Sequence, residues 1–412
     1  MIDMKVPFAL PDCGKDEIQE VTEVIKSRWL TTSSRTLRFE KEFAEHIGAR
    51  YCLAVNSGTA ALHLGLEALG ITRENKVIVP IHTFSATAEV VRYLGADPVF
   101  VDVDRSTFCI TAEVIEKLLD RHGEMINDGS LKAIIPVHFG GHPCDMDGIM
   151  EVAQSSDLRV LEDAAHAFPA FCQFSSQKDA SSKQRLKNRD LKMVGTIGDV
   201  TCFSFYATKP ITTAEGGMLA TDDDRINKRV QVMRLHGINA DIWSRFSDTQ
   251  ADWSYDVIAP GFKYNMPDIT AALGIHQLRK AEQFRKRREI IAKTYYQELA
   301  NIPGLILPKI KCSIENHSWH LYVALIEPKE TIDGINRDQF IQKMKEKDIG
   351  TSVHYIPLHR MTYYRKQYGL RPEMFPNSEW VFQHCVSLPI YSAMADGQVE
   401  YVVDSIREIL KR

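Results

Sequence analysis

Short apolar runs alternate with helix-like stripes through the first two-thirds of the chain. Runs of strand length occupy residues 51–55, 77–80, 98–102, 133–137 and 158–163. Between them, apolar residues recur at helical spacing over residues 16–29, 60–69 and 86–94. Apolar strands separated by helices predict an α/β fold with a mostly parallel sheet covered by helices on both faces. On such a sheet, ligands bind at the carboxyl ends of the strands.

Residues 173–193 break this alternation. Serine, lysine, glutamine and aspartate are frequent in this stretch, and so polar a segment cannot bury enough apolar surface to form part of a core. We predict a mobile insertion on the protein surface, and a role for it as a lid stays open.

A different pattern begins near residue 265. A long, highly charged helical stretch is expected over residues 268–299, with a break near Arg279. The shorter elements that follow are expected at residues 319–326 (a strand), 338–347 (a helix) and 399–410 (a helix). This change predicts two domains, a large one of residues 1–265 and a smaller α+β one of residues 266–412.

Composition narrows the class of protein. The chain has 412 residues, of which 44% are hydrophobic and 25% charged, as is ordinary for a globular protein. The net charge is −4 and basic residues are spread along the chain, so we expect no nucleic-acid partner. No apolar run approaches the roughly 18 residues of a membrane helix, and the first residues do not resemble a signal peptide. Eight cysteines without a Cys-x-x-Cys pair favour a reduced, cytoplasmic protein with neither disulfides nor a metal site.

The candidate chemistry centres on Lys209. The apolar run 203–207 contains no basic residue and leads to this lysine, which is followed by a turn rich in small residues and glycine at 210–217. Burial disfavours an ammonium group, so a lysine held there tends towards the neutral amine that forms a Schiff base with a carbonyl cofactor. Alone, a lysine at the end of a strand is more often a surface residue whose charge reaches solvent.

Three other segments, each directly after a predicted strand, change that balance. Residues 56–62 combine a serine suited to cap a helix with a glycine that admits a ligand to the backbone, which is typical of a phosphate site and also of an ordinary helix start. Asp163 ends an apolar strand, where its carboxylate either meets a partner such as a protonated pyridine nitrogen or caps the next helix. Phe84 either lies against an aromatic ring or belongs to the core. Together with Lys209, these segments form the set needed to hold pyridoxal phosphate.

The chain also resembles the DegT-type nucleotide-sugar aminotransferases, a family of fold type I pyridoxal-phosphate enzymes. The resemblance runs nearly from end to end and is carried by residues 27–31, 56–62, 95–102, 162–167, 203–217, 261–278 and 353–359. Its most specific part is a Ser-Phe-x-x-x-Lys segment that ends at Lys209, with Glu-Gly-Gly shortly after it.

The resemblance implies a role for each matching position. Lys209 would carry the Schiff base and later move the proton between substrate and cofactor, and Asp163 would bind the pyridine nitrogen. The other cofactor contacts it implies are His166 at the phenolic oxygen, Phe84 against the ring, and Gly58, Thr59 and Ser204 at the phosphate.

One phosphate ligand in this family crosses over from the partner subunit, from a loop that matches residues 261–266. Many relatives have asparagine where this chain has Lys263. A lysine can still reach a phosphate as a point charge. The resemblance therefore implies a homodimer in which each active site uses two chains.

The reaction that the resemblance implies has two halves. An amino acid, usually glutamate, gives its amino group to the cofactor, and a nucleotide-linked keto-sugar then accepts it. The product would serve surface glycans or a glycosylated metabolite. Candidate contacts to the acceptor, each with an alternative as a surface or packing residue, are Tyr206, His320, His354, Tyr355 and His359. No arginine stands out as the group that binds the carboxylates of the donor.

Two other functions stay open. A sugar dehydratase of the same family uses the cofactor without transferring nitrogen and has histidine in place of the Schiff-base lysine, so Lys209 disfavours it. A non-catalytic, cofactor-binding regulatory protein is the third possibility. The chain also departs from the family pattern twice. The insertion at 173–193 lengthens the path from Asp163 to Lys209, and Ser33-Ser34 replaces a more usual Gly-Pro, which is expected to alter the mouth of the substrate site.

Overall fold

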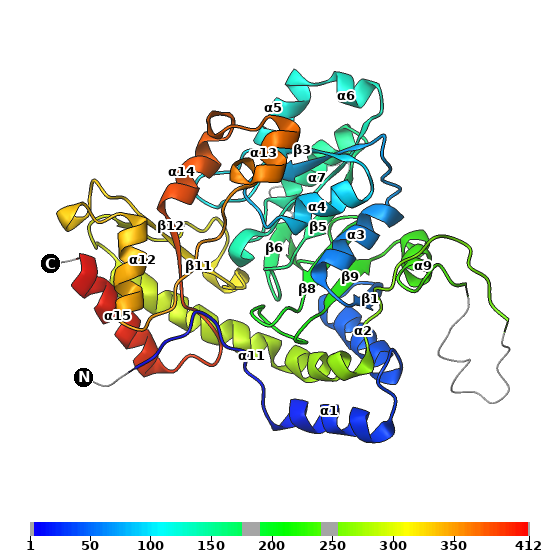
Figure 1. Ribbon diagram of the computed structural model, residues 1–412, viewed down its shortest axis with the longest axis horizontal. Helices are drawn as coiled ribbons and strands as arrows, with labels where there is room; N and C mark the ends of the chain where they lie inside the picture. The colour runs from blue at the N-terminus through cyan, green and yellow to red at the C-terminus, as the bar shows by residue number, and fades with distance from the viewer. Residues whose placement is uncertain (1–3, 175–189, 240–253, 411–412) are drawn as a thin grey trace.

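The larger part of the protein is built on a seven-stranded sheet (Figure 1). A computed structural model describes residues 4–174, 190–239 and 254–410. In spatial order the strands are β1 (Tyr51–Val55), β9 (Gly217–Thr221), β8 (Val200–Ser204), β5 (Arg159–Asp163), β4 (Leu131–Ile134), β2 (Lys76–Pro80) and β3 (Asp97–Val101). In this sheet β9 alone runs antiparallel to its neighbours, so the predicted mostly parallel sheet is confirmed. The sequence pattern did not predict β9, because its Gly-Gly start is typical of a turn.

Helices cover both faces of the sheet, as the apolar strands predict. One face packs against α3 (Gly58–Ala68), α4 (Ala86–Tyr93) and α9 (Asp224–Met233). The other face packs against α5 (Ala112–Arg121), α7 (Met146–Ser155) and α2 (Ser34–Ile47). The short helix α6 (Glu124–Asn127) precedes β4, and α1 (Lys15–Ser27) lies against the long helix α11 (Asp268–Leu299).

The helix α2 was missed by the pattern analysis, although Phe39, Phe43 and Ile47 form a buried stripe at helical spacing. The Ser33-Ser34 departure from the family pattern lies at its start. Ser33 is buried, and its backbone N–H donates to Oδ1 of Asp268 (2.7 Å) at the start of α11. This hydrogen bond ties α2 to α11, and the expectation that the pair alters the mouth of the substrate site stays a prediction.

The long helix α11 runs without interruption, so the predicted break near Arg279 is wrong. The density of charge there reflects an exposed side of the helix, where Arg279 pairs with Glu42 of α2 (3.6 Å). The two ends of α11 pack in different apolar clusters. Ile275 packs in the cluster under α2, and Tyr295 packs in the cluster around a second sheet. Figure 1 shows this helix running beneath both parts of the molecule.

The second sheet has three antiparallel strands, β10 (Leu305–Ile306), β11 (Tyr322–Ile326) and β12 (Cys385–Leu388). The helices of this part are α12 (Arg337–Glu346), α13 (Thr362–Tyr368), α14 (Pro376–His384) and α15 (Asp396–Leu410). Its apolar cluster also includes Val6, which bridges to Ile349. The smaller α+β part is therefore present, and the division at residue 265/266 stays a prediction.

The ends of the 173–193 stretch are ordered, which corrects part of the prediction for it. The strands β6 (Phe171–Phe174) and β7 (Asp190–Met193) pair antiparallel as a two-stranded sheet. Residues 175–189, to which the expectation of mobility mainly applies, lie outside the described residues. None of the helices within the described ranges combines the length and the apolar character needed to cross a membrane.

Candidate active site

A cavity of about 410 Å³ lies at the carboxyl ends of β5 and β8. This is the edge at which a parallel sheet is expected to bind its ligand. The site residues predicted from sequence that line it are Gly58, Thr59, Phe84, Asp163, His166, Ser204, Tyr206, Lys209, His320, His354 and Tyr355. The fold thus brings together side chains from segments that are far apart in the chain.

Lys209 lies in the loop after β8, where its backbone N–H donates to the carbonyl oxygen of Tyr206 (2.9 Å). Burial lowers the pKa of Lys209 to about 8, and the nearby Asp163 carboxylate opposes this effect. No ion pair holds its amine among the described residues. The loop therefore favours the neutral, nucleophilic form of the amine at a pH where an ordinary lysine is charged.

Asp163 is the last residue of β5 and is 5% exposed. Its Oδ2 accepts a hydrogen bond from Oγ1 of Thr87 (2.8 Å), and its Oδ1 accepts one from the N–H of Ala165 (3.1 Å). Burial raises the pKa of the carboxyl, and these two hydrogen bonds act against the rise. Turns rather than a helix follow the strand, so the alternative that Asp163 caps the next helix is wrong.

His166 is held as a neutral ring. Its Nδ1 accepts the N–H of Gly140 (3.2 Å), so the ring hydrogen lies on Nε2, which is 2.9 Å from the hydroxyl of Tyr355. Burial lowers the pKa of His166 well below its usual range. Because Nε2 donates to Tyr355, the hydroxyl hydrogen of that tyrosine is left for a group in the cavity.

The first turn of α3 forms another wall of the cavity. Ser57 caps this helix by accepting the N–H of Ala60 (3.0 Å). A Cβ atom at Gly58 would lie 2.8 Å from Cβ of Ser204, so only glycine fits here. A helix start leaves backbone N–H groups without partners and carries a partial positive charge. This wall is suited to bind a phosphate.

Phe84 is 57% exposed, which rules out the alternative that it belongs to the core. Its ring centre lies 5.8 Å from that of Tyr355, with the ring planes at 50°. An exposed aromatic ring on the wall of a cavity can stack on a flat ligand.

Two predicted residues do not line this cavity. Lys263 lies on the loop that precedes α11, and its amine contacts the side chain of Asn265. Its role in a partner subunit's site stays a prediction. His359 is fully buried, stacks on Phe375 (ring centres 5.5 Å apart) and bonds to Glu379 (2.9 Å) through Nε2. As a candidate contact to the acceptor it is wrong, because packing and an acidic partner occupy it.

Two further residues that sequence reasoning did not single out support the side chains of this site. Thr87 holds Asp163, and its position one turn after Phe84 was the available signal. Arg288 of α11 contacts the loop of Lys209, because its Nη1 donates to the carbonyl oxygen of Pro210 (3.3 Å). Its place in a charged run of α11 gave no sign of this contact.

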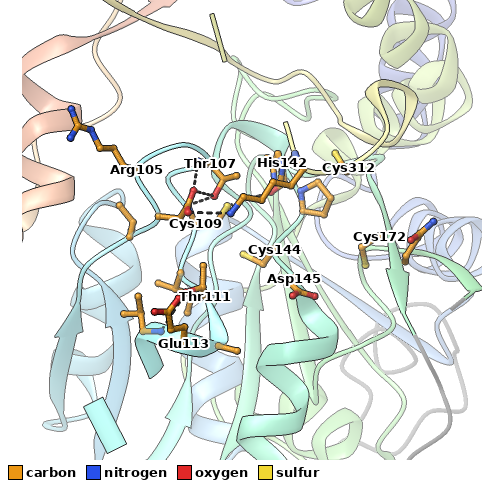
Figure 2. A pocket seen from close by; sticks show the side chains of 18 of the residues that line it. Arg105, Thr107, Cys109, Thr111, Glu113, His142, Cys144, Asp145, Cys172 and Cys312 are labelled. Carbon is orange, nitrogen blue, oxygen red and sulfur yellow. Dashed lines mark hydrogen bonds and ion pairs between the residues drawn. The ribbon is translucent and has the colours of Figure 1, made fainter. Parts of the chain in front are cut away.

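A larger cavity of about 950 Å³ lies elsewhere, beside Asp104 and Lys311 (Figure 2). These two side chains form an ion pair (3.1 Å). Four thiols line the cavity, at Cys109, Cys144, Cys172 and Cys312. Among the described residues, no group of three or more His, Cys, Asp or Glu side chains is placed to hold a metal ion. Most of the predicted site residues line the cavity at Lys209, and the charged groups there have fewer partners than those of the larger cavity. We therefore regard the cavity at Lys209 as the candidate active site.

Known proteins share the sequence pattern and the fold of this chain. A model of the DegT/DnrJ/EryC1/StrS aminotransferase family matches residues 11–407. The chain is 44% identical over 407 residues to the spore coat polysaccharide biosynthesis protein SpsC of Bacillus subtilis, covering 98% of this chain and 97% of that protein. The PLP form of Spr1654, a putative sugar aminotransferase from Streptococcus pneumoniae, is 28% identical with a TM-score of 0.84 and 98% coverage of both chains. Helicobacter pylori PseC, an aminotransferase involved in the biosynthesis of pseudoaminic acid, is 26% identical with a TM-score of 0.84, covering 99% of this chain and 100% of that one.

Proposed function

Because the chain belongs to the DegT/DnrJ/EryC1/StrS aminotransferase family, we propose that it transfers an amino group from an amino acid, L-glutamate, to a nucleotide-linked keto-sugar. The observation that carries this proposal is that Lys209 and Asp163 line one cavity at the carboxyl edge of the sheet. The proposed product is an amino-sugar nucleotide for polysaccharide or other glycan synthesis, in keeping with the name of SpsC as a spore coat polysaccharide biosynthesis protein. The cysteine usage supports a cytoplasmic enzyme.

The residues of this cavity fit pyridoxal 5′-phosphate, which we propose as the cofactor. Its phosphate would lie at the start of α3, near Gly58, Thr59 and Ser204. Asp163 would hold the ring nitrogen, with Phe84 on the ring face. When bound, this cofactor supplies an electron sink for the bonds at the donor's α-carbon. A protonated ring nitrogen would give the buried Asp163 carboxylate the positive partner that Thr87 and Ala165 do not provide.

Lys209 would act as both nucleophile and proton carrier. Its Nζ would take the proton from the α-carbon of the donor, and in the second half-reaction it would return a proton at the carbon that was the acceptor's carbonyl. An amine with a pKa near 8 can take up and release a proton close to neutral pH, as this role demands. Retention of this lysine argues against the dehydratase alternative, which needs a histidine in its place.

The pair His166 and Tyr355 would orient ligands. With Nε2–H of His166 fixed on its hydroxyl, Tyr355 presents its own hydrogen to an oxygen in the cavity. Tyr206, which is 47% exposed, and the two histidines His320 and His354 line the same space. We propose these side chains as contacts to the sugar-nucleotide, and Lys263 as a phosphate ligand in the partner subunit of a homodimer.

The direct test is a stepwise half-reaction assay. Purified protein loaded with the cofactor should absorb as a lysine adduct and bleach when L-glutamate is added. A panel of nucleotide keto-sugars should then restore the first spectrum, and mass spectrometry should find an amino-sugar nucleotide. A lysine adduct that no amino donor bleaches would refute the proposal and favour a non-catalytic protein.

A further inference from the structure

A second cavity, of about 20 Å³, meets the first around Lys209. Thr208, Lys209 and His320 line both cavities. Residues 9–12 near the start of the chain, which include Asp12, and Arg288 of α11 also line the smaller one. Its volume admits one small polar group, about the size of a water molecule or a carboxylate.

Arg288 brings a positive charge to this small cavity without an acidic partner. The residue is 3% exposed. Its Nε donates to the carbonyl oxygen of Ser318 (2.9 Å) and its Nη1 to that of Pro210 (3.3 Å). Its Nη2 is buried and has no partner among the residues that the structure describes. A guanidinium has five N–H groups, so most of its hydrogen-bonding capacity is free.

Arg285 on the same helix has the acidic partners that Arg288 lacks within the described ranges. Arg285, one turn earlier, is also buried, and it pairs with both Glu282 (3.0 Å) and Glu289 (3.1 Å). No carboxylate lies within ion-pair distance of Arg288 in the described parts of the chain. Burial, with repulsion from Arg285, lowers the pKa of the Arg288 guanidinium to about 9. A buried charge is stable only when it is paired, so a ligand anion would complete this site.

The chemistry of the two substrates decides which anion fits. The amino donor carries a carboxylate on the same carbon as the reacting amine, one bond from the atom that Lys209 must reach. The diphosphate of a sugar-nucleotide is too large for a cavity of about 20 Å³. We propose that Arg288 binds the α-carboxylate of the amino donor beside Lys209. This inference rests on the proposed transamination and names the group that recognises its donor.

The test compares Arg288→Gln with Arg288→Lys and with the matched control Arg285→Gln. For Arg288→Gln, kcat/KM for L-glutamate in the first half-reaction should fall about 100-fold, as expected when one partner of a buried charge pair is lost. 4-Aminobutyrate, which lacks the α-carboxylate, should react equally slowly with wild type and variant. The second half-reaction, started from the amine form of the cofactor with a keto-sugar nucleotide, should lose far less than the first, because it does not use the donor's α-carboxylate.

Arg288→Lys keeps the charge and should lose less, about tenfold, for glutamate alone. If Arg288→Gln does not fold, the comparison of Arg288→Lys with the wild type takes its place. Arg285→Gln leaves Arg288 in place and should keep the wild-type preference for glutamate over 4-aminobutyrate. Calorimetric binding of glutarate, which cannot react, gives a readout independent of turnover and should weaken in both Arg288 variants.

Equal losses for glutamate and 4-aminobutyrate, or unchanged glutarate binding, would overturn the inference and leave Arg288 as a residue that only positions the Lys209 loop. Failure of the wild-type protein to react with any amino donor is a different result, because it contradicts the proposed function itself.

Discussion

The cavity at Lys209 and the larger cavity beside Asp104 differ in how their charges are compensated. In the larger one, the Asp104 carboxylate accepts hydrogen bonds from Ser106 and Thr107 and pairs with Lys311. Together these partners lower its pKa despite burial. In the cavity at Lys209, burial raises the pKa of Asp163 and lowers that of Lys209, so both charged forms are disfavoured. Ionisable groups whose pKa values are shifted by burial and that lack a charged partner indicate a reactive site better than the volume of a cavity does.

The largest effect that this contrast predicts is for Lys209→Ala. Turnover should fall by at least about 10⁴-fold, because the variant loses both the nucleophile and the proton carrier. The fold should persist, since the amine is not part of an apolar cluster. Steady-state kinetics and circular dichroism check the two statements. Substantial transamination by this variant would mean that another amine does the chemistry.

A smaller loss is expected for Asp163→Asn, of about 10²- to 10³-fold in turnover, as for other buried electrostatic contacts to a reacting group. The amide keeps the size of the side chain and can still accept from Thr87, but it cannot hold a protonated ring nitrogen. Kinetics of each half-reaction give the measurement. The prediction fails if both half-reactions keep their wild-type rates in protein shown to be fully loaded with cofactor.

The pH dependence of Lys209 sharpens the contrast further. In the cofactor-free protein, its reaction with trinitrobenzenesulfonate, followed by peptide mapping, should rise with a midpoint near pH 8. The pKa of an ordinary lysine is about 10.4. Asp163→Asn removes a negative charge that favours the ammonium, so the midpoint should move to lower pH. A midpoint near 10 in the wild type would contradict the burial argument.

The smallest effect is expected in the larger cavity. Lys311→Met breaks the ion pair with Asp104. In this pair the side chain of Lys311 is 53% exposed and that of Asp104 is 26% exposed. Solvent screens such a pair, so the free energy of unfolding should fall by about 1 kcal/mol or less, and turnover should not change. Denaturant melts and kinetics measure both. A tenfold loss of turnover would show that this cavity takes part in the reaction.

The sequence predicted the sheet and most of its strands, because buried parallel strands leave continuous apolar runs. It also singled out residues at or shortly after the ends of strands, including Asp163 and Lys209. The helix α11 was expected to break because its charged residues obscure an apolar face that changes from one core to the other. Strand β9 was missed because its glycines are typical of turns.

Parts of the site depend on contacts between segments far apart in the chain, and no local pattern reports these. His359 belongs to a motif-like segment, yet Phe375 and Glu379 enclose it. Arg288 is one of several arginines in a charged run, and its lack of an acidic partner is visible only once α11 lies against the Lys209 loop. Burial and pairing, which decide these two roles, are properties of the folded chain.

The central claim is that the amine of Lys209 is the one that bonds to the cofactor. Reduction of the loaded protein with borohydride fixes that bond, and peptide mapping by mass spectrometry then locates it. The account predicts the reduced cofactor on the peptide that contains Lys209, and no such label in Lys209→Ala. A label on any other lysine of the wild-type protein would contradict it.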